Sequence, residues 1–146
     1  MQEQAGPHAL TLIICKSIER ERPERPGTYH GVTNLISVTG RPDQRAGLLQ
    51  PAARFTVEAR FAAGLARGTH RFGLQVLIGD NPPHVLQSRE IRLVDGRQEV
   101  RLTRTWELKR APAGTIWFES LIDDFIVMRV PFMVEFVAPP SGELNA

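Results

Sequence analysis

Several features that carry function in other proteins are scarce or missing in this sequence of 146 residues. Its single cysteine, Cys15, excludes an internal disulfide and favours a reducing compartment. No apolar run approaches the roughly 20 residues of a membrane-spanning helix. The short apolar segment at 9–15 follows Glu3 with no basic residue before it, which argues against a secretory signal. We therefore expect a cytoplasmic protein with no membrane contact.

Motifs that bind cofactors or carry out catalysis are missing as well. The sequence has no G-x-G-x-x-G or Walker phosphate loop and no G-x-S-x-G nucleophile motif. Its four histidines lack the close spacing of metal ligands, and Cys15 lies in an apolar segment, where a free cysteine is typically a small buried side chain. We predict no cofactor and no enzymatic activity, and the sequence identifies no small-molecule ligand. A metal-dependent or hydrolytic enzyme is the weaker alternative.

Acidic residues in predicted turns leave one metal site open as an alternative. Asp123 and Asp124 are adjacent, and the ordinary interpretation is a tight turn, because Asp side chains bond nearby backbone amides. The alternative is calcium bound at loop tips through Asp80, Asp95, Asp123 and Asp124, since Ca²⁺ takes about 6–8 oxygen ligands.

Period-two alternation of apolar and polar residues is present throughout the chain. In "THRFGLQVLIG", Phe72, Leu74 and Val76 share one face while Arg71 and Gln75 share the other, which is typical of a half-buried strand. This pattern predicts strands at about 9–17, 28–39, 54–62, 69–79, 85–94, 99–109, 114–122 and 125–136. No window has the 3.6-residue period of an amphipathic helix.

Short turn signals rich in Gly, Pro and Asp separate these segments. Strands joined by short turns pair antiparallel, because a parallel pair needs a long crossover connection. The sequence therefore predicts an all-β fold, an antiparallel β-sandwich of about eight strands, immunoglobulin-like or related. We expect a single domain over 1–146 with frayed ends at about 1–7 and 138–146.

Charge is nearly balanced overall, with 18 Lys and Arg against 16 Asp and Glu. The conspicuous stretch "SIERERPERPG" at 17–27 has three Arg and three Glu, and phosphate binding needs an excess of cations. Alternating charges with two prolines are typical of a solvated loop or strand end. We predict a solvated loop, with a binding element as the alternative.

An uneven distribution of charge gives one further functional hypothesis. Residues 85–110 carry an excess of cations, and residues 111–146 carry an excess of acids. Nucleic acid or an acidic partner on a basic patch is one interpretation; the patch would comprise Arg89, Arg92, Arg97 and Arg101. The favoured interpretation is that the two regions are neighbouring strands whose charges pair across the sheet. We therefore expect no nucleic-acid binding.

The C-terminal segment "FIVMRVPFMVEF" at 125–136 predicts a docking surface. Its even positions are all apolar and are expected in the core, yet apolar residues also occupy the odd face. Large exposed apolar patches are uncommon on monomers, so this face favours a protein partner or a homodimer. The candidate interface residues are Trp117, Leu121, Phe125, Val127 and Met133. The alternative is that residues 40–54 or the N-terminal residues of the same chain cover the face.

Three segments carry a resemblance to a known family. They are "LTLIICKSI" near the N-terminus, "GTYHGVTNLISV" after the charged stretch, and the closing "GTIWFESLIDDFIVMRVPFMVEF". Their order resembles a bacterial family of small cytoplasmic proteins that is defined only as a domain of unknown function. The resemblance implies a β-sandwich and an interaction or accessory role, and it implies no catalytic residue. The longer "ERERPERP" linker and the basic stretch 85–110 depart from the family pattern.

Overall fold

The computed structural model describes residues 5–22, 25, 27–39, 48–110 and 115–137. Within these ranges the chain is all-β, and the absence of helix from the described residues agrees with the sequence prediction. The strands in chain order are β1 (His8–Cys15), β2 (Ser17–Glu19), β3 (Thr28–His30), β4 (Leu35–Thr39), β5 (Leu48–Ala62), β6 (Gly68–Ile78), β7 (His84–Leu93), β8 (Glu99–Arg110), β9 (Ile116–Ile122) and β10 (Phe125–Val137).

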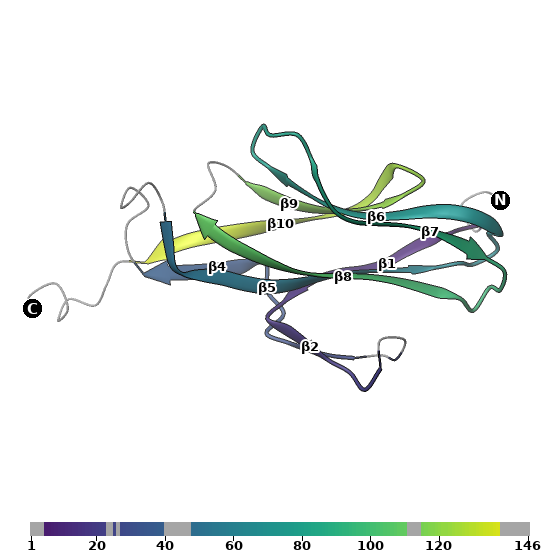
Figure 1. Ribbon diagram of the computed structural model, residues 1–146, viewed down its shortest axis with the longest axis horizontal. Helices are drawn as coiled ribbons and strands as arrows, with labels where there is room; N and C mark the ends of the chain where they lie inside the picture. The colour runs from purple at the N-terminus through teal and green to yellow at the C-terminus, as the bar shows by residue number, and fades with distance from the viewer. Residues whose placement is uncertain (1–4, 23–24, 26, 40–47, 111–114, 138–146) are drawn as a thin grey trace, which may run out of the picture.

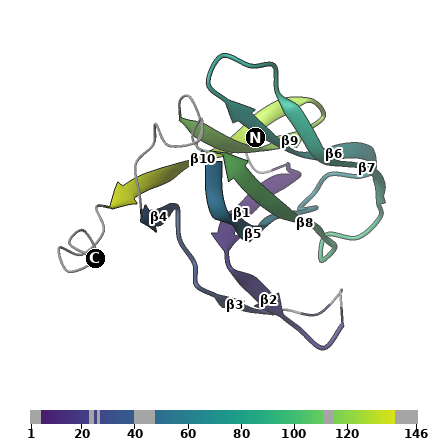
Figure 2. The same cartoon turned by 60° about the vertical axis from the view of Figure 1, so that its left-hand side comes forward.

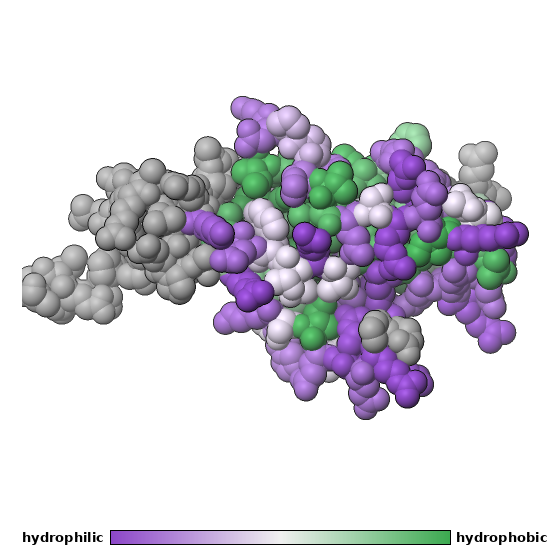
Figure 3. Space-filling model, viewed as in Figure 1, coloured by the Kyte–Doolittle hydropathy of each residue, from purple (hydrophilic) through white to green (hydrophobic). Residues whose placement is uncertain are grey.

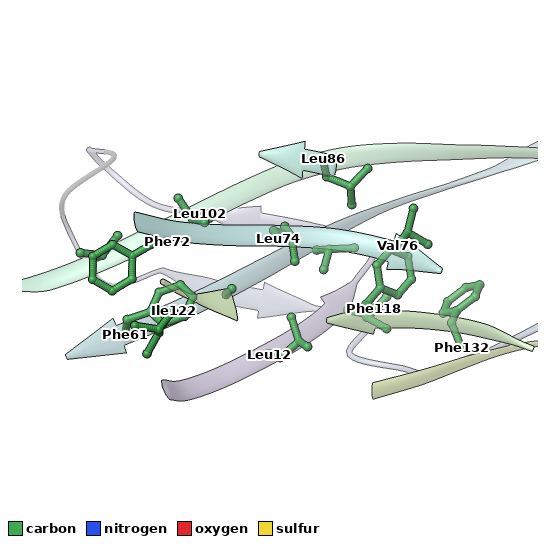
Figure 4. Close-up of a cluster of buried hydrophobic side chains, with 14 of the residues drawn as sticks. Leu12, Phe61, Phe72, Leu74, Val76, Leu86, Leu102, Phe118, Ile122 and Phe132 are labelled. Carbon is green, nitrogen blue, oxygen red and sulfur yellow. The ribbon is translucent and has the colours of Figure 1, made fainter. Parts of the chain in front are cut away.

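Two larger sheets form the body of the molecule (Figure 1). One has the strand order β1-β5-β8 and the other the order β4-β10-β9-β6-β7. Their inner faces enclose one apolar cluster, to which both sheets contribute side chains (Figure 4). Phe55 of β5 stacks on Phe132 of β10 with ring centroids 4.4 Å apart, and Phe61 of β5 meets Phe72 of β6 at 4.9 Å. Alternation along each strand places these rings inward.

One pair of strands departs from the expected antiparallel arrangement. β4 pairs with β10 in parallel, with Leu35 beside Met133. The rule that short turns give antiparallel pairs applies to strands that follow one another along the chain. Residues 40–124 separate β4 from β10, so this rule does not constrain their direction.

The predicted strand 28–39 is in fact two strands in different sheets. Its first part, β3, pairs with β2 in a two-stranded hairpin, and its second part, β4, joins the five-stranded sheet. Gly31 between them has φ of +66°, a conformation that a β-strand does not adopt and that glycine tolerates best. The alternation on either side of Gly31 could not show that the chain changes sheet there.

The β2–β3 hairpin lies against the outer face of the three-stranded sheet, below it in Figure 1. Half-buried Ile18 and Tyr29 are opposite each other in the hairpin. The prediction of a solvated loop is therefore wrong for residues 17–20, which form a strand and its continuation. The hairpin makes the two outer faces of the molecule unlike, because it covers part of one of them.

Candidate interaction surface

The outer face of the five-stranded sheet, turned away from the core, carries most of the residues that the sequence predicted as an interface. Three rows of neighbours across β6, β9 and β10 define it, and we refer to it as the outer sheet face. The rows are Leu77–Trp117–Pro131, Gln75–Glu119–Arg129 and Gly73–Leu121–Ile126. A polar row thus lies between two rows that are mostly apolar.

The polar row is anchored by a buried carboxylate. Glu119 is 2% exposed, although it belongs to the outer face. Its Oε1 accepts a hydrogen bond from Gln75 Nε2 at 2.8 Å, and its Oε2 lies 3.1 Å from Arg129 Nε. The Arg129 guanidinium in turn stacks over the Trp117 ring, 4.2 Å from its centroid. Two interactions therefore hold Arg129 in place while nearly half of its side chain, 47%, stays exposed.

Exposed apolar side chains surround this centre along β10. Phe125 is 75% exposed, Met133 56% and Val127 41%. Trp117 and Leu121 are half-buried in the face itself. Trp117, Leu121 and Met133 thus lie on one surface, and Val127 adjoins it at the start of β10. Phe125 is opposite the buried Ile122, so its side chain leaves the sheet on the other side. The exposed Leu35 of β4 extends this surface beside Met133.

Ile126 was expected in the core with the other even positions of β10, and this prediction is wrong. The register between β9 and β10 shifts between Ile126 and Met128, so that Ile126 is opposite Leu121 and Met128 opposite Ser120. The extra residue, Val127, moves Ile126 to the outer face, where it is exposed. Beyond the bulge the prediction holds, because Met128, Val130, Phe132 and Val134 pack into or against the core.

β10 contains Pro131, which lacks an amide donor and therefore predicts an edge strand or a bulge. It lies between β9 and β4, but its pairing with β4 begins only at Met133. Pro131 lies before that pairing, where a missing amide donor is tolerated.

The described N-terminal residues do not cover the outer sheet face. Gly6 lies against the Ala63 carbonyl, and the Ala5 carbonyl lies near Gly64, both beyond the end of β5. Residues 48–54 belong to β5 in the other sheet, and residues 40–47 lie outside the described ranges.

A hollow of about 70 Å³ beside Gly73 and Leu121 has room for about two water molecules at ~30 Å³ each or one small side chain.

The four arginines of the predicted basic patch are not brought together. In the register of β6 and β7, Arg92 is opposite Thr69, on the outer face of the sheet. Arg89 is opposite the buried Phe72, on the core-facing side. Arg97 lies in the turn before β8. Arg101 lies on the opposite outer face of the molecule, 3.2 Å from Glu99 and 3.9 Å from Glu58.

The interpretation that the basic and acidic regions are strand neighbours is wrong. β7 pairs with β6 and β8 pairs with β5, so neither basic strand adjoins β9 or β10. Acids of both regions instead pair with arginines from outside them. Glu90 and Asp124 both lie near Arg71 of β6, and Glu99 pairs with Arg60 of β5. Alternation along a strand gives no information on which strand lies beside it, and the prediction failed for that reason.

In the acidic turn between β9 and β10, the side chain of Asp123 is engaged by neighbouring residues of the chain. Asp123 and Asp124 have φ of +50° and +70°, a conformation typical of a two-residue hairpin turn. Asp123 Oδ1 accepts a hydrogen bond from the Arg71 amide at 2.9 Å, and Oδ2 lies 2.7 Å from His70 Nδ1. Asp95 Oδ1 accepts from the Arg97 amide in the β7–β8 turn. Among the described residues, no group of three His, Cys, Asp or Glu side chains could hold a metal ion.

A buried carboxylate under the β2–β3 hairpin was not found from the sequence. Glu58 of β5 is 0% exposed, and its Oε1 lies 2.8 Å from Arg20 Nη2 and 3.4 Å from the Thr103 hydroxyl. Burial, together with a hydrogen bond to Glu58, raises the pKa of Tyr29 to about 12. The polar position of Glu58 in the alternation suggested a solvated side chain, so no local signal could have marked it.

Cys15 shares this covered face, because it is opposite Thr56 in the pairing of β1 and β5. It is fully buried, and its thiol lies 3.7 Å from the Thr56 carbonyl. Burial raises the pKa of the Cys15 thiol, and the nearby Glu58 carboxylate raises it further. Both effects disfavour the thiolate, which is the reactive form.

No protein-family model matches this chain, and no curated protein matches it significantly. The resemblance drawn from the sequence therefore stays a prediction. The part of the chain that the structure describes has no helix of the length and apolarity that a membrane crossing requires.

Proposed function

We propose that this protein is a non-enzymatic interaction module that binds a protein partner on its outer sheet face. The observation that carries the proposal is the concentration of exposed apolar side chains on this one face, from Leu35 and Met133 to Ile126 and Val127. Large exposed apolar surfaces are uncommon on soluble monomers, and in other proteins they mark interaction sites.

The centre of the face supports the same proposal. Trp and Arg are the residue types that contribute most at protein interfaces, and Arg129 is already held on Trp117 by the buried Glu119. A side chain that is ordered before binding loses less conformational entropy when the partner arrives. The partner that fits presents apolar side chains around an acceptor group, such as a carboxylate or a backbone carbonyl, that faces Arg129.

The proposal includes the finer features expected from the sequence. These are a β-sandwich of immunoglobulin-like or related type, membership of the bacterial family that the sequence resembles, and a cytoplasmic location. The facing sheets around a single apolar cluster support the sandwich.

Capture from a lysate of the source organism, followed by validation with the purified partner, tests the docking face. The variant Val127→Lys/Met133→Lys places two charges on the outer sheet face. The matched control, Leu65→Lys/Val94→Lys, changes two apolar side chains in the loops that are even more exposed. We expect the first variant to weaken binding of the purified partner at least ~10-fold, equivalent to about 1.4 kcal/mol, and the control to leave it unchanged. Equal binding by both variants would refute the proposal.

A further inference from the structure

The strand β8 forms one edge of the three-stranded sheet. It pairs with β5 along its whole length, from Glu99 to Arg110, and no other described strand pairs with its second side (Figure 2). An edge of this length presents a row of backbone N–H and C=O groups that can pair with another strand. No proline interrupts β8, so its backbone donors are intact.

The charges on the outer side of β8 are self-complementary. From one end to the other these residues are Glu99, Arg101, Thr103, Thr105, Glu107 and Lys109. Their signs are negative, positive, neutral, neutral, negative and positive. When a second copy of the strand is laid antiparallel to the first, Glu99 is opposite Lys109 and Arg101 is opposite Glu107. The two threonines are opposite each other at the centre.

We infer that two copies of this chain associate through β8, paired antiparallel about a two-fold axis at Arg104. The two three-stranded sheets then become one continuous sheet across the dimer. Each opposite-charge pair occurs twice by symmetry, as an isologous interface requires. On the core-facing side the same register places Leu102 beside Trp106 of the second copy.

The charge pattern selects this register over its neighbours. A shift of two residues in one direction places Glu99 opposite Glu107, and a shift in the other direction places Arg101 opposite Lys109. Like charges directly opposite each other destabilise a sheet. A shift by one residue turns the side chains of one strand to the wrong face of the sheet.

Arg104 makes the association weak and reversible. It is exposed on the core-facing side of β8, where it is opposite the buried Val57. In the dimer the two copies of Arg104 meet at the two-fold axis, and their repulsion opposes pairing. A cation pointing inward from an edge strand is a common protection against uncontrolled strand addition. The opposing effects predict that removal of this one charge tightens the dimer.

The β8 dimer and the outer sheet face use different surfaces. The outer sheet face belongs to the other sheet, so it stays available to a partner when two copies pair through β8. The inference therefore goes beyond the proposed function and does not depend on it.

Cysteine cross-linking tests the register directly. Neighbours across an antiparallel pair have Cα atoms about 4.5–5.5 Å apart, within the range that a disulfide spans. We expect Arg104→Cys to form a covalent dimer under mild oxidation, and a mixture of Glu99→Cys with Lys109→Cys to form a mixed dimer. Either of these two variants alone should form none, because its own copies lie far apart. The native Cys15 is buried, and the wild-type chain controls for it. Failure of both predicted cross-links would overturn the inference.

Sedimentation equilibrium over a range of concentrations tests the energetics without a covalent bond. We expect Arg104→Thr to lower the dimer dissociation constant about fivefold, and Glu107→Lys to raise it at least ~10-fold, because like charges replace opposite ones. Circular dichroism verifies that both variants are folded. A wild-type chain and an Arg104→Thr variant that are both monomeric at about 1 mM would refute the dimer. Loss of the dimer in Val127→Lys/Met133→Lys, with no effect of Glu107→Lys, would instead assign self-association to the outer sheet face.

Discussion

The two ring nitrogens of His70 both face acceptors. Nδ1 lies 2.7 Å from Asp123 Oδ2, and Nε2 lies 3.2 Å from the Arg67 carbonyl oxygen. Only the protonated imidazole donates from both nitrogens, so the neutral ring loses one of the two bonds. The hydrogen bond to Asp123 raises the pKa of His70, although burial of the ring opposes this. Burial acts to raise the pKa of Asp123, but hydrogen bonds from the Arg71 amide and from His70 outweigh it and lower that pKa.

This geometry predicts a pH-dependent contribution to stability. A raised pKa means that folding favours the protonated ring, so the stabilisation is complete below the unfolded-state pKa of about 6.5 and is lost as the pH rises through the folded-state value. We expect wild type to exceed His70→Gln in free energy of unfolding at pH 5.5 by about 1 kcal/mol or less, because solvent screens an exposed pair. Asp123 is 46% exposed. The difference should narrow by pH 8.5.

Urea unfolding at each pH measures this difference, and an NMR titration of the His70 ring measures its pKa directly. Asp123→Asn is the control, because it removes the charged acceptor and should return the pKa of His70 toward its ordinary value. A difference between wild type and His70→Gln that is the same at pH 5.5 and pH 8.5 would contradict the assignment.

At the scale of elements, the β2–β3 hairpin is attached to the three-stranded sheet through Glu58. Arg20, which follows β2, reaches this carboxylate, and Arg101 of β8 lies 3.9 Å from the same oxygen. The solvent-facing surface of the hairpin is mostly hydrophilic, as the lower part of Figure 3 shows. An ion pair at a buried carboxylate is costly to break from one side, because the remaining charge stays buried.

Removal of the Arg20 charge should therefore loosen the hairpin. We expect Arg20→Met to lower the free energy of unfolding by about 2–3 kcal/mol, less than the ~3–5 kcal/mol of a broken buried pair, because Arg101 remains beside Glu58. The Cys15 thiol lies on the covered face, so its rate of reaction with a thiol reagent should rise as the hairpin opens. Thiol-reaction kinetics and urea unfolding measure the two effects.

The exposed Arg22 in the same segment supplies the control. Arg22→Met removes an equal charge from a solvated position. It should change the free energy of unfolding by no more than about 0.5 kcal/mol and leave the rate of Cys15 reaction unchanged. If Arg20→Met also left both the stability and the Cys15 rate unchanged, the ion pair would not be what attaches the hairpin.

At the scale of the whole molecule, a group of aromatic rings joins the two sheets. The ring of Phe55 in β5 packs against Trp106 of its own sheet, with ring centroids 5.3 Å apart. It also packs against Phe118 and Phe132 of the facing sheet, with centroids 5.8 Å and 4.4 Å away. Such ring pairs contribute beyond the apolar area that they bury. The two sheets therefore depend on each other for stability and should unfold together.

Truncation of the Phe55 side chain should destabilise both sheets at once. We expect Phe55→Ala to lower the free energy of unfolding by about 3–5 kcal/mol, through lost burial and the cavity left behind. Tryptophan fluorescence, which reports on Trp106 in one sheet and on Trp117 in the other, and far-ultraviolet circular dichroism should give coincident unfolding curves for wild type and variant. Val85→Ala, at an exposed position, is the control and should cost less than about 0.5 kcal/mol. Two separate transitions would show that the sheets are independent.

The two outer faces of the molecule differ because only one of them carries the hairpin. The hairpin covers Glu58, Thr56 and Cys15 on the three-stranded sheet, whereas the outer sheet face keeps its apolar side chains exposed. A partner that needs apolar contact therefore finds it on the five-stranded sheet. The β8 edge offers unpaired-strand backbone groups and a self-complementary order of charges, as the proposed pairing with a second copy of the chain requires.

The sequence by itself determined the strand content and the inward faces of most strands. Alternation in β6 placed Phe72, Leu74 and Val76 in the core, and all three are buried. The tight turn at Asp123 and Asp124 was equally clear. These features depend on neighbouring residues, so a local pattern suffices to predict them.

Only the tertiary structure decided which strands lie side by side and which polar side chains are buried. The parallel pairing of β4 with β10, the bulge that turns Ile126 outward, and the burial of Glu58 and Glu119 all depend on residues far apart in the sequence. Alternation marks both glutamates as polar positions on an outer face. Whether such a face meets water, a hairpin or an arginine stacked on tryptophan is determined by packing between strands, on which a period of two residues carries no information.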